Sequence, residues 1–242
     1  MHKLAFVAIT GLTVSAVCIG AAAAIGGKEF SNGMDISLFD DKPRCEAIPG
    51  VTATSRDLDW DGGDHVSINV PAHTQYSPSN GDKVHLSGDP QVIAHIRVRD
   101  GKVEADCHTH MHLGDDVITI NLPGRQFRKF GIAGSGKMAL EHLDQEQVKV
   151  TIAGSGSIKA DGKVNHAEIS IAGSGNADLS KVETQIVMVH IAGSGDTDIA
   201  PTDEADIHIA GSGNVNLHSN PKRIDTHIAG SGRIRNLGSG GI

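Results

Sequence analysis

The sequence predicts an all-β fold of one kind, a single-stranded right-handed parallel β-helix (β-solenoid) with coils of about 19 residues. Three observations lead to this prediction. The pentapeptide Ile-Ala-Gly-Ser-Gly occurs six times in the second half of the chain. Apolar and polar residues alternate on both sides of each copy. Glycine accounts for 30 of the 242 residues, whereas aromatic residues account for only 3%.

The spacing of the pentapeptide gives the expected coil length. Its copies occupy residues 132–136, 152–156, 171–175, 191–195, 209–213 and 228–232, so they recur every 18 to 20 residues. Even offsets from each isoleucine are mostly apolar, which is typical of strands that bury one face. Glycine permits a sharp bend between two such strands. The serines at these predicted bends are Ser135, Ser155, Ser174, Ser194, Ser212 and Ser231. We expect one coil per repeat, stacked in parallel about 4.8 Å apart with the usual right-handed crossover.

The domain organisation follows from this repeat. A β-helix domain is predicted over residues 48–242, with irregular coils over 48–130 and regular coils over 131–236. Apolar runs at 65–71, 92–98 and 117–123 are expected to form strands of the irregular coils. Residues 25–47 are expected to be an N-terminal linker or cap.

Residues 1–24 have the pattern of a secretory signal peptide. They start with Met1-His2-Lys3, continue as an apolar run and end in four alanines, which predicts cleavage after Ala24. Two alternatives stay open, an uncleaved membrane anchor and a lipoprotein modified at Cys18. Beyond the signal, no run of about 18 apolar residues occurs, so no further membrane-spanning helix is expected.

Composition excludes some functions. The formal net charge is −8 and the aromatic residues number seven, so the chain lacks the basic surface and the stacking platforms of a nucleic-acid-binding protein. After signal removal, Cys45 and Cys107 remain, an even number as expected in an oxidising compartment. A disulfide between them and two buried free thiols are both compatible with the sequence.

No catalytic residues are predicted. A nucleophilic serine needs an adjacent base, and neither a histidine nor an acid holds a constant position beside all six bend serines. We therefore expect a protein without enzymatic activity and without a cofactor. An enzyme acting on polysaccharides is the less favoured alternative, since it would rest on analogy with other β-helices alone.

Two groups of residues are candidate metal ligands. His108, His110 and His112 alternate along one predicted strand, and imidazole suits Zn²⁺, Ni²⁺ and Cu²⁺. Asp178, Asp196 and Asp198 follow two of the bends and are similar to a calcium-binding nonapeptide, although the period here is about 19 residues rather than nine. The alternative for both groups is a solvent-exposed polar row.

A third group is a predicted histidine ladder. His190, His208 and His227 each precede a repeat isoleucine, so they should stack on successive coils. Stacked imidazoles could chelate a metal, or they could repel one another when protonated and lower stability below about pH 6. A ladder without function is the alternative.

The repeat also resembles a known family. The Ile-Ala-Gly-Ser-Gly series, together with Val70-Pro71, Gly88-Asp89 and Leu122-Pro123, is similar to the putative auto-transporter adhesin head GIN domain of exported bacterial proteins. The resemblance covers roughly residues 48–240. It implies a right-handed β-helix, a location in the cell envelope and an adhesive role, and it supplies no catalytic residues.

These observations predict an exported, non-enzymatic protein of the bacterial cell envelope that acts as an adhesin-like binding surface or scaffold. Its partner would be a glycan or a protein, and its ligand-binding residues are not identified. The alternative is a periplasmic structural protein or one that binds metal or calcium. The sequence up to Ile242 shows no alternating strands of a membrane barrel, so the periplasm and the cell surface are both compatible. A homo-oligomer formed through a solenoid end is also compatible.

Overall fold

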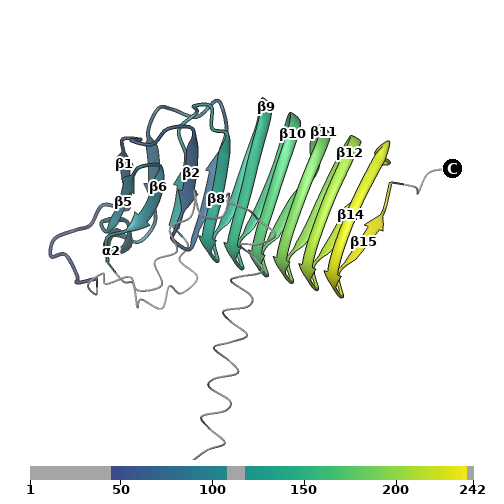
Figure 1. The fold of residues 1–242 in the computed structure, drawn as a ribbon. Helices are drawn as coiled ribbons and strands as arrows, with labels where there is room; N and C mark the ends of the chain where they lie inside the picture. The colour runs from purple at the N-terminus through teal and green to yellow at the C-terminus, as the bar shows by residue number, and fades with distance from the viewer. Residues whose placement is uncertain (1–44, 108–117, 239–242) are drawn as a thin grey trace, which may run out of the picture.

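A computed structural model of the chain describes residues 45–107 and 118–238. These residues form a β-solenoid of about 5 turns, as predicted. Figure 1 shows strands β9 to β14 side by side along the stack, with β1, β5, β6 and α2 at its N-terminal end. The predicted signal peptide, residues 1–24, lies outside the described residues. Within them, no helix is long and apolar enough to cross a membrane.

One short helix and fifteen strands make up the described fold. They are β1 (Ser55–Leu58), β2 (His65–Ile68), β3 (Ala72–Tyr76), β4 (Val84–Ser87), α2 (Pro90–Ile93), β5 (Ile96–Arg99), β6 (Lys102–Ala105), β7 (Ile118–Asn121), β8 (Lys129–Gly134), β9 (Lys137–Gly154), β10 (Ser157–Gly173), β11 (Asn176–Gly193), β12 (Asp196–Gly211), β13 (Asn214–Leu217), β14 (Arg223–Gly230) and β15 (Arg233–Asn236).

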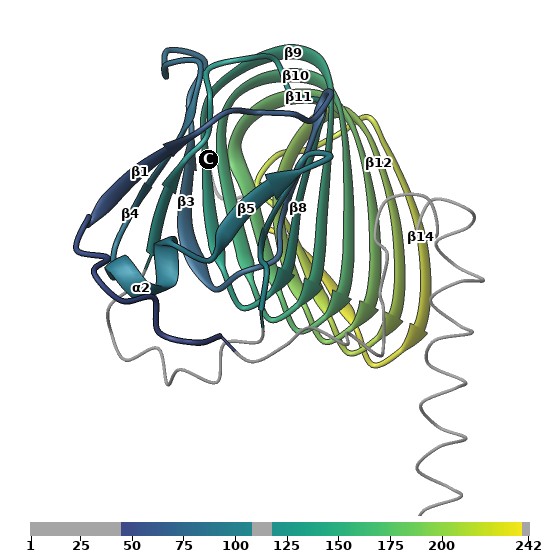
Figure 2. The same ribbon diagram turned by 90° about the vertical axis from the view of Figure 1, so that its left-hand side faces the viewer.

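The regular coils stack in parallel with equivalent residues in register. The repeat isoleucine of each coil pairs with that of the next, as in Ile152↔Ile171 and Ile171↔Ile191. The first five repeat isoleucines, Ile132 to Ile209, are buried, and the apolar residues at even offsets from them complete the core. The stacked coils lie behind one another when the solenoid is viewed from its end (Figure 2).

From the second bend onward, both glycines are required by the stacking. The first adopts a positive φ, 134° at Gly193, and a Cβ there would lie 2.2 Å from the Gly173 carbonyl oxygen of the preceding coil. The second packs on the core, and a Cβ at Gly195 would lie 2.7 Å from Ile171 Cγ2. The serine between them is exposed. Its backbone N–H donates to the preceding coil, at 2.8 Å from Ser194 to Gly173.

The polar stretch between successive repeats is also β-structure. Strands β9 to β12 each run from one bend to the next. This stretch buries Leu143, Val164 and Val182, one in each of three successive coils. Differences in repeat length are absorbed here, since the register between neighbouring coils shifts after Lys159 and after Leu179.

The N-terminal region is less regular than the coils that follow it. Strands β2 and β3 form one coil-like turn that stacks in parallel on β8 and β9, more than 60 residues further along the chain. The segment between β3 and β8 adds a further layer on the other side, in which β6 and β7 pair in parallel with β2 and β3. The pairs β1–β4, β4–β7 and β5–β6 are antiparallel. An end coil exposes strand edges and core, and this region covers them as a cap.

The strand predicted at 92–98 is wrong in its first half. Val92 and Ile93 belong to the helix α2, and β5 begins only at Ile96. The Asp89 carboxylate accepts a hydrogen bond of 2.7 Å from the Gln91 backbone N–H, and Pro90 occupies the first turn. Aspartate before proline is a strong helix start, and here it outweighs the β preference of the apolar run.

Aromatic packing and a disulfide hold the cap together. Phe127 is fully buried and contacts Trp60, Tyr76 and Phe130, with ring centroids 5.1 to 5.9 Å apart. Cys45 and Cys107 are joined by a disulfide with their Cα atoms 4.9 Å apart. The structure therefore joins two cysteines whose pairing the sequence leaves open.

The opposite end of the described solenoid has no such cover. Strand β14 stacks on β12, and β15 stacks on β13. The inward-pointing Ile224 and Ile228 of β14 remain 43% and 44% exposed.

Candidate binding surface

The stacked coils present two regular outer faces. We call the first the histidine face. It consists of the outward residues just before each bend, and its three columns are Lys149, Glu168, Met188, Asp206 and Asp225; Thr151, Ser170, His190, His208 and His227; and Ala153, Ala172, Ala192, Ala210 and Ala229. Parallel, in-register strands dictate these columns, because outward residues alternate with the buried apolar ones.

The predicted histidine ladder exists. The rings of His190 and His208 stack with centroids 5.1 Å apart, and those of His208 and His227 with centroids 4.8 Å apart and planes within 7°. Burial, followed by the charge that His208 would carry, lowers the pKa of His190 below its usual value. The neutral form of His190 is therefore favoured.

An exposed apolar side chain lies within the charged column of this face. Met188 is 40% exposed, and its neighbours in the column are Glu168 and Asp206. Further along, Lys149 Nζ and Glu168 Oε1 form an ion pair of 3.0 Å. An apolar centre with a polar rim is the usual anatomy of a protein–protein interface.

The second face, the asparagine face, carries the outward residues just after each bend. Asp196 Oδ1 accepts hydrogen bonds from the Asn214 backbone N–H and side-chain amide at 3.0 and 2.8 Å. Asp198 Oδ1 accepts from Asn216 Nδ2 at 3.1 Å and lies 2.7 Å from His218 Nε2. These side chains bind one another across neighbouring coils.

Asp178 belongs to the same face and is also engaged. Burial raises the pKa of its carboxyl, but hydrogen bonds from the hydroxyl and N–H of Ser180, and the charge of Lys159, outweigh this effect, so its pKa lies below the usual value. The structure thus brings the predicted calcium ligands Asp178, Asp196 and Asp198 onto one face, with protein donors at each carboxylate. The other predicted ligands, His108, His110 and His112, lie outside the described residues.

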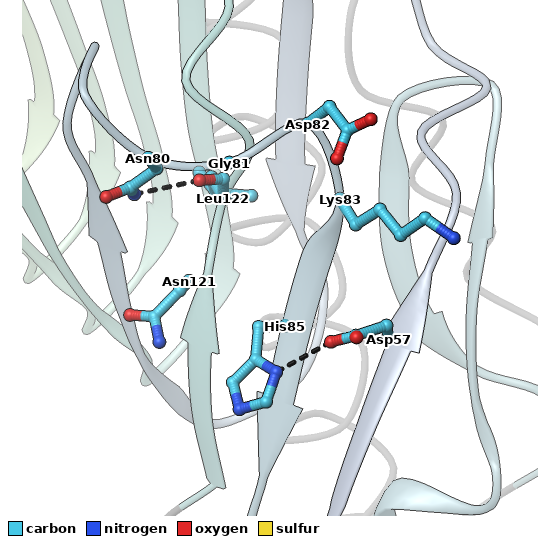
Figure 3. A pocket seen from close by; sticks show the side chains of 8 residues that line it. All are labelled: Asp57, Asn80, Gly81, Asp82, Lys83, His85, Asn121 and Leu122. Atoms are coloured by element: carbon cyan, nitrogen blue, oxygen red, sulfur yellow. Dashed lines mark hydrogen bonds and ion pairs between the residues drawn. The ribbon is translucent and has the colours of Figure 1, made fainter.

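A groove of about 440 Å³ lies in the cap, away from both regular faces. It is open and mostly polar. His85 Nδ1 lies 2.6 Å from Asp57 Oδ1, and Asn80 Nδ2 donates to the Leu122 carbonyl at 2.9 Å (Figure 3). Lys83 at its rim pairs with Asp59 at 3.3 Å. Three of its charged or titratable groups, Asp57, His85 and Lys83, are therefore engaged with protein partners.

Met188 and Asp206 were not predicted from the sequence to lie on an outer face. Both occupy a column whose members are Lys, Glu, Met and Asp, and so share no residue type. The signal that could have found them is the offset of three residues before each repeat isoleucine, which places them on the outward face beside the histidines.

A family comparison identifies the chain. Residues 64–221, more than half of the sequence, match the model of the family described as putative auto-transporter adhesin, head GIN domain. The chain belongs to this family. No curated protein shows a significant sequence match to it.

Solved structures resemble this head GIN domain chain in fold. A putative adhesin from Bacteroides fragilis is 18% identical, with a TM-score of 0.57, and the match covers 82% of this chain and 100% of that one. A putative lipid binding protein from Parabacteroides distasonis is 19% identical, with a TM-score of 0.49, covering 76% and 96% of the two chains. At this level of identity, the likeness to the first structure establishes the shared solenoid.

Proposed function

We propose that this head GIN domain protein is an exported, adhesin-like binding protein whose histidine face contacts a protein partner. Its membership in an adhesin family supports a binding role. Met188 is the reason for choosing this face, because it is an exposed apolar side chain between acidic neighbours on a regular surface. Methionine adapts to different partners because it is unbranched and polarizable.

A protein partner is favoured over a glycan by the location of the aromatic rings. Sugar-binding surfaces commonly use exposed aromatic rings for stacking, but Tyr76, Phe127 and Phe130 are buried in the core of the solenoid. Trp60 packs edge-on against Phe127 within the cap. On the described histidine face, recognition would rely on Met188, the charged column and the imidazoles.

Location is the first experiment. We would tag the C-terminus of the protein in its native bacterial host and measure antibody and protease access in intact and permeabilised cells. Access in intact cells is the expected result, because an adhesin must be exposed. Access only after permeabilisation would overturn the adhesin role and leave a periplasmic scaffold.

The face is tested separately by substitution. Met188→Glu should weaken binding of the protein partner by at least tenfold, because it places a charge at the apolar centre of the interface. Lys159→Glu on the asparagine face is the matched control and should leave binding unchanged. Equal loss in both variants, or loss in neither, would contradict the assignment of the histidine face.

A further inference from the structure

The end of the histidine ladder holds a compact array of metal-ligating groups. In the pairing of β12 with β14, Asp206 lies opposite Asp225 and His208 lies opposite His227. One ligand atom each from Asp206, His208 and His227 lies within 4.8 Å of the other two. This array is distinct from the three aspartates of the asparagine face.

One oxygen of the array has no hydrogen-bond donor. Asp206 Oδ1 is buried, and it lies 3.0 Å from His208 Nε2 without the alignment of a hydrogen bond. No other donor reaches it from the residues that the structure describes. A buried carboxylate oxygen without a donor is costly, and a cation bound beside it would remove that cost.

We propose that Asp206, His208 and His227 form a binding site for Zn²⁺. Two imidazoles and a carboxylate match the ligand set of open zinc sites, whereas Ca²⁺ and Mg²⁺ prefer oxygen ligands alone. Zinc–ligand bonds of about 2.0–2.1 Å place tetrahedral ligand atoms about 3.4 Å apart. The Asp206–His208 pair is already near this separation, so the site closes by rotation of His227, whose side chain is 66% exposed.

A carboxylate that can orient His227 is also present. Asp225 Oδ1 lies 3.7 Å from His227 Nδ1, and carboxylates near the second nitrogen of a ligating imidazole orient the ring. Three protein ligands leave a fourth coordination position open toward solvent. Zinc binding at this site does not depend on the proposed adhesive function.

The other convergent group in the described structure does not compete. Cys45, His95 and Cys107 also lie close together. Their two sulfur atoms form the disulfide, so they offer no thiolate to a metal in the oxidised protein.

The experiment is a calorimetric titration of the metal-free full chain with zinc chloride in a non-chelating buffer at pH 7.5. The expected result is one zinc per chain and an affinity about 100-fold lower in His208→Gln and His227→Gln. His218→Gln, which removes a histidine of the asparagine face, is the control and should keep the affinity. Circular dichroism of each variant verifies that the solenoid is folded.

Two outcomes would overturn the site. Zinc binding that survives both substitutions would place the metal elsewhere, and loss of binding only on replacing His108, His110 and His112 would assign it to those residues. No binding by the folded wild-type chain would contradict a zinc site at this end of the histidine ladder. Substitution with Co²⁺ gives an independent readout, since its visible absorption is intense only in four-coordinate sites.

Discussion

Buried hydroxyl groups show how strictly each core position is specified at the residue scale. Thr197 is fully buried in β12, in a column whose neighbours on the adjacent coils are Ala177 and Val215. Its Oγ1 makes no hydrogen bond within the described part of the chain. Thr184 in β11 is also buried, but its hydroxyl donates to the carbonyls of Asn165 and Ile186 at 3.3 and 3.4 Å.

Thr197→Val should therefore stabilise the protein by about 1 kcal/mol, because it keeps the shape of the side chain and removes an unsatisfied polar group. Urea unfolding, followed by circular dichroism, measures the change. Thr184→Val is the matched control and should destabilise the protein, because it removes a hydroxyl that donates to the carbonyls of Asn165 and Ile186. Destabilisation by both substitutions would show that the Thr197 hydroxyl has a partner.

At the scale of elements, the cap and the coils are stabilised by different interactions. The coils rely on in-register stacking of β9 to β12. The cap relies on the Phe127 cluster and on contacts of the segment that begins at Cys45. Within that segment, the Ile48 backbone N–H donates to Gln91 Oε1 at 2.8 Å, and Gln91 Nε2 donates back to the Ile48 carbonyl at 3.1 Å.

The disulfide should stabilise the cap selectively. Its cysteines are separated by 62 residues. In the entropic model, closing such a loop raises the free energy of the unfolded chain by about 4 kcal/mol. Reductant should lower the melting temperature of a first transition that reports on residues 45–107, while the coils β10 to β12 unfold later. Proteolysis with mass spectrometry during heating assigns the transition.

The double variant Cys45→Ser/Cys107→Ser provides the control for that experiment. It should melt early without reductant and show no further change when reductant is added. An identical melting temperature for the oxidised and reduced wild-type chain would contradict a stabilising role for the disulfide.

On the scale of the whole molecule, stability should vary along the solenoid. Each inner coil has two neighbouring coils, whereas β14 and β15 stack on one side only among the described residues. In solenoids, stability is approximately a sum over nearest-neighbour interfaces. Amide hydrogen exchange should therefore be slowest in β10 and β11 and fastest, among the regular coils, in residues 223–236.

Hydrogen exchange measured at several protein concentrations tests this gradient. Fast exchange over residues 223–236 at every concentration is the expected result for an open end. Protection of these residues that increases with concentration would contradict it, and would show that a second copy of the chain covers Ile224 and Ile228.

Much of the site was predictable where it depended on the repeat. The stacking of His190, His208 and His227 follows from one offset relative to the bend, because in-register coils place equal offsets side by side. The proximity of Asp206 to His208 and the protein donors around Asp196 were not predictable. They depend on side-chain conformations, which the periodicity does not specify.

The coil length, the bends and the buried columns are encoded in the local sequence. These features are local: each depends on a few adjacent residues, such as the glycines of one bend, and six copies repeat the same signal. Three features follow from the folded chain instead. Strands β2 and β3 stack on β8 and β9, Cys45 meets Cys107, and residues 92–93 form a helix within the cap. Such contacts join segments far apart in the chain. They form because one end of the solenoid must cover its exposed edges and core, and a cap that occurs once leaves no repeated pattern in the sequence.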